Sequence, residues 1–137
     1  MKLTQLIPML NVSNLEISLE FYEKALGFEL VSSKEELKEW RWGIIRSGDT
    51  ELMLSETQTD LGLSKDIDPH QDTSWPTIFY FYPDDVTELY KHAINNGYKT
   101  TSLEITFYGM KEFSMQDPDG HLLTFGQDSD ETIIKKI

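Results

Sequence analysis

The sequence predicts an α+β fold built from two tandem βαβββ repeats. Its hydrophobic pattern changes from strand-like to helical period and back, and then does so again, within 137 residues. Three pairs of landmark residues also recur at one constant spacing of 70 positions: Asn14 and Asp84, Gly27 and Gly97, Asp49 and Asp119. Self-similarity at a fixed period indicates one supersecondary unit used twice.

The first repeat is expected over about residues 3–56. It opens with an apolar, extended segment at residues 3–12, where Pro8 opposes a helix. An apolar stripe then predicts a helix that Asn14 begins and Gly27 ends. Three strands follow in the segments FELVSS, EWRWGIIRS and TELMLSE, and the polar segments KEELK and SGD are expected to be the turns between them.

The second repeat is expected over about residues 75–127. The aromatic segment WPTIFYFY predicts its first strand. Asp85 and Glu88 have the spacing of a capping box at the start of the next helix. The last three strands are expected in YKTTSLEI, KEFSMQ and HLLTFGQ. A single domain over 1–137 is thus expected, with a linker at 57–74 and an added tail at 128–137.

Composition narrows the classes of partner. The chain has 24 acidic and 12 basic residues and a net charge of −12, which argues against nucleic acid. This charge is compatible with cationic or neutral small ligands, and equally with solubility alone. The absence of cysteine excludes disulfides and thiolate metal sites and favours a cytoplasmic location. No apolar run has the length of a membrane span.

Two segments carry a resemblance to a known family. NVSNLEISLEFYEKALGFEL and FSMQDPDGHLLTFGQ are similar to the opening and closing signatures of the vicinal oxygen chelate superfamily, which includes glyoxalase I, extradiol dioxygenases, fosfomycin-resistance enzymes and bleomycin-resistance binding proteins. The resemblance covers about residues 3–127. It implies two modules whose mixed sheets curl into a half-barrel, with helices on the convex side, a ligand in the concave cleft, and a homodimer.

Enzymes of this superfamily hold a divalent metal at the first and last strands of each repeat. Carried over by motif and by the spacing of 70, these positions are Ile7, Leu54, Thr77 and Thr124. None supplies an imidazole or a carboxylate, so no metal and no cofactor are expected. Glu51 and His121 are expected on the opposite strand face. A second candidate for a cation, Asp66, Asp68, His70 and Asp72, lacks the glycine and the last glutamate of an EF-hand loop, which favours a solvated linker over a cation site.

Strand alternation from these positions predicts an aromatic cleft with few polar groups. Leu52 is expected there too, and Trp40 and Trp42 are expected to share one face of a strand. Tyr108 is placed like the lid residue of relatives. The predicted ligand-binding residues are Met9, Trp40, Trp42, Glu56, Trp75, Phe79, Phe81 and Tyr108. The alternative for each aromatic residue is the core or a dimer interface.

No catalytic constellation is visible: the chain has no nucleophile elbow, no cysteine and no phosphate loop. The opening LIPMLNVSN resembles the metal-free bleomycin-resistance type, which acts by sequestration. The expected function is therefore binding of a small aromatic or cationic ligand, with antibiotic resistance as the biological role. One alternative is a lyase or dioxygenase-like enzyme with unusual metal ligands, or with metal-free acid–base catalysis by Glu56 or a tyrosine. A non-catalytic interaction protein is the other.

Overall fold

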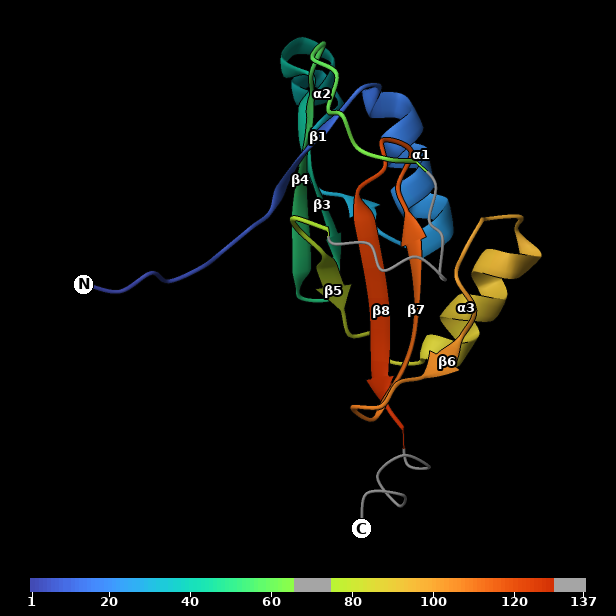
Figure 1. The fold of residues 1–137 in the computed structure, drawn as a ribbon. Helices are drawn as coiled ribbons and strands as arrows, with labels where there is room; N and C mark the ends of the chain where they lie inside the picture. The colour runs from blue at the N-terminus through green and yellow to red at the C-terminus, as the bar shows by residue number, and fades with distance from the viewer. Residues whose placement is uncertain (66–74, 130–137) are drawn as a thin grey trace. The chain divides into compact units, whose positions relative to one another are not determined.

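The computed structural model describes residues 1–65 and 75–129 (Figure 1). It divides into two compact units, Met1–Gly62 and Leu63–Ile137. Each unit holds a four-stranded mixed sheet and at least one helix, so the predicted α+β class and the tandem βαβββ arrangement are confirmed. No helix among the residues described is long and apolar enough to cross a membrane.

The first unit, called module 1, has the sheet order β1-β4-β3-β2. The edge strand β1 runs parallel to β4, and the other pairs are antiparallel. The elements of module 1 are β1 (Met9–Val12), α1 (Leu15–Leu26), β2 (Glu29–Leu30), α2 (Lys34–Trp40), β3 (Trp42–Ser47) and β4 (Thr50–Glu56). The strand expected over residues 3–12 is thus shorter than predicted, and Leu3 is 98% exposed.

Helix α1 begins and ends where the sequence predicts. The side chain of Asn14 accepts a hydrogen bond from the Ile17 backbone N–H at 3.0 Å, and Gly27 takes a left-handed conformation with φ of 73°. The helix buries Tyr22 among other residues, and the ring of Tyr22 meets Phe28 edge-on at 5.8 Å. Its core partners on the sheet are Leu10, Val12, Ile45, Leu52 and Leu54.

The segment KEELK was expected to be a turn. It forms most of helix α2 instead. Ser33 caps this helix by accepting from the Glu36 backbone N–H at 3.1 Å. Trp40 is therefore the last residue of a helix and not part of a strand. Arg41 follows with a left-handed φ of 51°, and Trp42 starts β3. The prediction that the two tryptophans share one strand face is wrong, because a helix end and a left-handed residue separate them.

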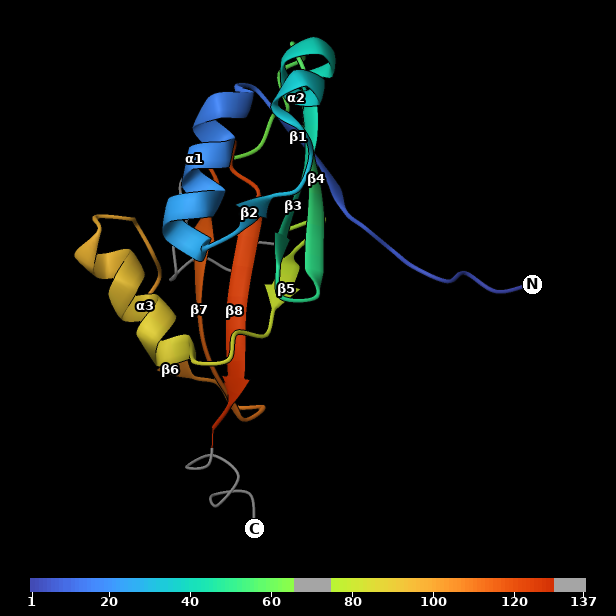
Figure 2. The same ribbon diagram turned by 180° about the vertical axis from the view of Figure 1, so that it is seen from behind.

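The second unit, called module 2, has the sheet order β5-β8-β7-β6, with β5 parallel to β8. Figure 2 shows α3 lying along one side of β7 and β8. The elements of module 2 are β5 (Phe79–Phe81), α3 (Val86–Asn95), β6 (Glu104–Ile105), β7 (Met110–Gln116) and β8 (Leu122–Asp128). Asp85 is the N-cap of α3, as the spacing predicted, because its side chain accepts from the Glu88 backbone N–H at 3.1 Å.

A stack of aromatic rings forms the core between α3 and the sheet. Phe81 stacks on Phe125 at 5.3 Å between ring centroids, and Phe125 stacks on Phe113 at 5.1 Å. Phe113 meets Tyr90 of α3 edge-on at 5.3 Å. These contacts identify the face of the sheet that α3 covers, and they place Phe81 on it.

The spacing between equivalent positions is not constant. The N-cap of α3 is Asp85, which follows Asn14 by 71 residues, whereas the constant spacing of 70 paired Asn14 with Asp84. On the helix-covered faces, the pair Leu10–Leu54 of module 1 corresponds to Phe81–Phe125 of module 2, again 71 residues later. A shift of one residue moves a side chain to the other face of a sheet. The predicted faces of β4 and β5 are therefore wrong.

Candidate functional site

The site is built on the face of the module 2 sheet turned away from α3, called here the distal face. Strand register decides which side chains lie there. Tyr80 is paired with Thr124, and Thr124 with Ser114, whose hydroxyls are 2.8 Å apart. Because faces alternate along a strand, these residues lie opposite the Phe81–Phe125 stack. The distal face is thus polar and tyrosine-rich.

Two tyrosine hydroxyls converge on one carboxylate of this face. The hydroxyl of Tyr80 donates to Glu112 Oε2 at 2.8 Å, and that of Tyr108 donates to Glu112 Oε1 at 2.7 Å. Burial, and after it the hydrogen bond to Glu112, raises the pKa of both tyrosines above its ordinary value. Both phenols are therefore neutral donors at neutral pH.

Tyr80 reaches Glu112 because β8 carries a glycine between them. Gly126 is the cross-strand partner of Glu112. A Cβ atom at Gly126 would collide with the Tyr80 hydroxyl and would lie 2.6 Å from the Cζ atom of its ring. Gly126 is fully covered, whereas two further aromatic residues at this site are exposed: Tyr82 by 78% and Phe107 by 91%.

The corresponding face of module 1 carries other side chains. Met9, which is 56% exposed, is the register partner of Met53, and Trp42 is the register partner of Ser55. Both predicted ligand-binding residues of this face, Met9 and Trp42, thus lie on the side away from the buried Leu10 and its neighbours. Their role in binding remains a prediction.

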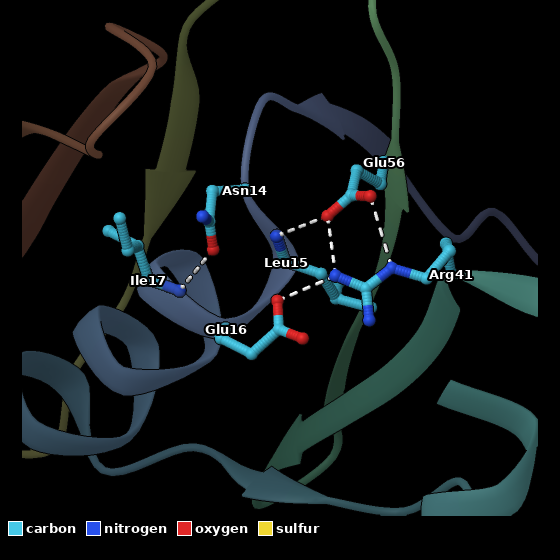
Figure 3. A network of polar contacts seen from close by, with 6 residues as sticks. All are labelled: Asn14, Leu15, Glu16, Ile17, Arg41 and Glu56. Atoms are coloured by element: carbon cyan, nitrogen blue, oxygen red, sulfur yellow. Dashed lines mark hydrogen bonds and ion pairs between the residues drawn. The ribbon is translucent and has the colours of Figure 1, made fainter. Parts of the chain in front are cut away.

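Glu56 does not lie on that side (Figure 3). Its carboxylate accepts from the backbone N–H of Leu15 at 2.9 Å and from two nitrogen atoms of Arg41, at 3.0 and 2.7 Å. Arg41 also donates to Glu16 at 2.6 Å. These contacts, with Arg41 first, lower the pKa of Glu56 to about 2. Glu56 joins the start of α1 to the end of α2, and the cleft position expected for it is wrong.

The expected positions of two phenylalanines are corrected in the same way. Phe81 belongs to the stack under α3, and Phe79, two residues earlier, pairs with buried Leu123 on that same face. Leu52 is likewise in the core of module 1. Tyr80, which alternates with these two phenylalanines along β5, lies on the distal face instead, and the ring of Tyr82 lies 5.1 Å from its ring. The aromatic run was recognised in the sequence. The constant spacing of 70, however, assigned its side chains to faces one residue out of register.

The structure also gives the surroundings of the remaining candidate residues. Trp40 is 64% exposed at the end of α2, and Trp75 is half-buried just before β5. Glu51 pairs with Arg46 at 2.9 Å. His121 lies edge-on to Phe79 at 6.3 Å, away from Thr124 as expected. The candidate cation loop with Asp66, Asp68, His70 and Asp72 lies outside the described residues, as does most of the tail from residue 130.

The residues present do not fit a divalent metal. With the spacing corrected to 71, the four positions become Ile7, Met53, Ile78 and Thr124, which offer three apolar side chains and one hydroxyl. A catalytic metal requires about three imidazole or carboxylate ligands. Within residues 1–65 and 75–129, no group of three or more His, Cys, Asp or Glu side chains is arranged to hold a metal ion.

Comparison with known proteins gives the family. The model of the glyoxalase/bleomycin resistance protein/dioxygenase superfamily matches residues 4–125. The chain belongs to this superfamily. None of the proteins with curated functions matches it.

Solved structures of the superfamily fold cover nearly the whole chain. A bleomycin resistance determinant encoded on the transposon Tn5 is 24% identical, with a TM-score of 0.67 over 92% of this chain and 98% of that one. TioX from Micromonospora sp. ML1 is 17% identical, with a TM-score of 0.70 over 91% and 98%. At these identities the similarity establishes the fold, and the superfamily fold hosts several chemistries.

Proposed function

We propose that this superfamily member binds a small aromatic or cationic organic molecule without a metal and without transforming it. The observation that carries the proposal is the convergence of Tyr80 and Tyr108 on Glu112, with the Tyr82 ring 5.1 Å from that of Tyr80. Aromatic faces near a charged group are typical of sites for planar or cationic ligands.

The chemistry of the side chains supports binding rather than catalysis. The enzyme alternative would use Glu56 or a tyrosine for acid–base catalysis, but a carboxylate with a pKa of about 2 and two partners is a very weak base. The raised pKa of Tyr80 and Tyr108 keeps both phenols protonated, so neither is a base at neutral pH. The metal-dependent alternative lacks a donor set at the four family positions.

The enzyme and interaction-protein alternatives make different predictions. A lyase or dioxygenase-like enzyme would retain stoichiometric metal or would change its ligand. An interaction protein would show no affinity for small molecules. We further propose that the protein is a cytoplasmic homodimer that sequesters a toxic compound such as an antibiotic, in line with the 24% identical resistance determinant.

The test is a titration of untagged chain, in the presence of a chelator, with bleomycin and a panel of planar aromatic compounds. Binding would be followed by tryptophan and tyrosine fluorescence. We expect binding with one member at least, a weaker affinity in Tyr108→Ala, and an unchanged affinity in the control Tyr98→Phe. The ligand recovered after prolonged incubation should have an unchanged NMR spectrum. A converted ligand, or binding that requires added metal, would overturn the proposal.

A further inference from the structure

A second carboxylate lies directly beside Glu112. In the antiparallel pair β6–β7, Glu104 is the cross-strand partner of Glu112. Directly opposite residues project from the same face of a sheet, with Cβ atoms about 4.5–5.5 Å apart. Glu104 therefore belongs to the distal face as well. Two like charges in this relation destabilise a sheet, so the pair is unfavourable for the fold of the chain alone.

In the part of the chain that is described, neither of these two carboxylates forms an ion pair within 4.0 Å. The ion pairs of that part involve other carboxylates, those of Glu16, Glu20, Glu51, Glu56 and Glu88. The contacts of Glu112 are the two tyrosine hydroxyls, which carry no charge. A carboxylate has about four lone-pair directions, so Glu112 can accept further hydrogen bonds.

Each tyrosine bonded to Glu112 has a second aromatic ring beside it. Tyr80 and Tyr82 lie with ring centroids 5.1 Å apart and planes tilted by 55°. Phe107 and Tyr108 meet edge-on at 5.0 Å. Phe107 and Tyr82 are almost fully exposed, which leaves their faces accessible. Ring faces carry negative electrostatic potential and attract organic cations.

We propose that Glu104, Glu112 and the tyrosines Tyr80, Tyr82 and Tyr108 form a site selective for a planar organic cation. This rests on the proposed function and specifies its ligand class. A cation removes the repulsion between the two carboxylates, and a planar ring stacks on the exposed aromatic faces. The net charge of −12 adds long-range attraction for the same class of ligand. A neutral aromatic compound gains only the stacking.

A bare divalent ion is the competing occupant. Two carboxylates and phenol oxygens are hard donors, which Mg²⁺ and Ca²⁺ prefer. However, each oxygen of Glu112 already accepts a tyrosine hydroxyl, and a small ion makes no use of the four rings. The experiment therefore includes both metal ions as competitors.

The test compares three probes of nearly the same shape: N-methylacridinium, acridine and acridine-9-carboxylate. In mildly alkaline buffer they are cationic, neutral and anionic. We expect the full chain to bind the cation about tenfold more tightly than acridine and to bind the anion most weakly. Glu112→Gln and Glu104→Gln should each reduce the preference for the cation. Glu88→Gln, which removes the same charge from the exposed side of α3, is the control and should leave the preference unchanged.

The outcomes separate this inference from the proposed function. Equal affinity for the cation and acridine would overturn the selectivity while leaving ligand binding intact. Failure of all three probes to bind would count against both. Displacement of the cation by millimolar Mg²⁺ or Ca²⁺, but not by matched ionic strength of Na⁺, would assign the site to a metal ion instead. An equal loss of the preference for the cation in Glu88→Gln and Glu112→Gln would show that overall charge, and not this site, causes the preference.

Discussion

Glu56 and Gln127 are equivalent residues, 71 positions apart, and each accepts a hydrogen bond from the first turn of its module's helix. Glu56 accepts from the Leu15 backbone N–H at 2.9 Å, and Gln127 accepts from the Val86 backbone N–H at 2.9 Å. Both tie the end of the last strand to the start of the helix and satisfy a backbone donor that lacks a partner within the helix. Only Glu56 adds an ion pair, with Arg41.

Glu56→Gln gives module 1 a glutamine at the position where module 2 has Gln127. The amide can still accept from Leu15, but the charge partner of Arg41 is lost. Since the Arg41 side chain is 37% exposed, we expect the free energy of unfolding to fall by only about 1 kcal/mol. Chemical denaturation would measure this change. Glu51→Gln breaks the ion pair with Arg46 and is the matched control, with a smaller expected loss.

The same substitution should change the dependence of stability on pH. The pKa of Glu56 is about 2 in the folded chain and has its ordinary value of 4.5 in the unfolded chain. A lowered carboxyl pKa stabilises the folded state above pH 4.5, and this contribution disappears as the pH falls toward 2. The difference between wild type and Glu56→Gln should therefore shrink over that range. A constant difference would show that the charge of Glu56 has no part in it.

The start of α3 distinguishes two neighbouring aspartates. Asp85→Ala removes the side chain that accepts from the Glu88 backbone N–H, so we expect a loss of about 1 kcal/mol in unfolding free energy. Asp84→Ala should have little effect, because Asp84 contributes its backbone carbonyl to Gln127 and that group remains. Thermal unfolding of the two variants would rank them. A larger loss in Asp84→Ala would mean that Asp84, 70 residues after Asn14, is the N-cap instead.

Adjacent residues of β4 test which face is buried. Leu54 is fully buried, whereas Met53 is half-buried on the side of Met9. Leu54→Ala should lower the unfolding free energy by about 2–5 kcal/mol. Met53→Ala should cost clearly less. A larger effect at Met53 would mean that the register described for β1 and β4 is incorrect.

The close approach at Gly126 can be tested with a double-mutant cycle. Gly126→Ala places a methyl group against Tyr80, so we expect a loss of about 1–3 kcal/mol in unfolding free energy and weaker binding of N-methylacridinium. In a Tyr80→Ala background the obstacle is gone, and the same substitution should be nearly neutral in stability. Additive effects of the two substitutions would show that the residues do not touch.

Local chemistry explains what could be predicted from sequence. Asn14, Gly27 and Asp85 act on backbone groups a few residues away, and all three do what their residue types indicate. The superfamily signatures were equally informative, because they span both modules. The helix KEELKEW was missed because it buries no side chain and has no counterpart between β6 and β7.

The faces of the strands could not be obtained in this way. Helix α3 starts 71 residues after α1 but ends 69 residues after it, while the left-handed Gly97 follows Gly27 by 70. The turn between β3 and β4 has two residues, whereas that between β7 and β8 has five, from Asp117 to His121. The single spacing of 70 residues lies between these values and therefore misplaces elements that are 69 or 71 residues apart. An error of one residue then exchanged the core residue Phe81 for Tyr80 at the candidate site.

The proposed function is the binding of a ligand without a metal. The most direct measurement is the metal content of the untagged chain by mass spectrometry, after incubation with zinc, nickel, iron and manganese and then desalting. We predict far less than one metal ion per chain, since Ile7, Met53, Ile78 and Thr124 offer one hydroxyl between them. Retention of about one ion per chain would contradict this proposal and would favour a metal-dependent enzyme.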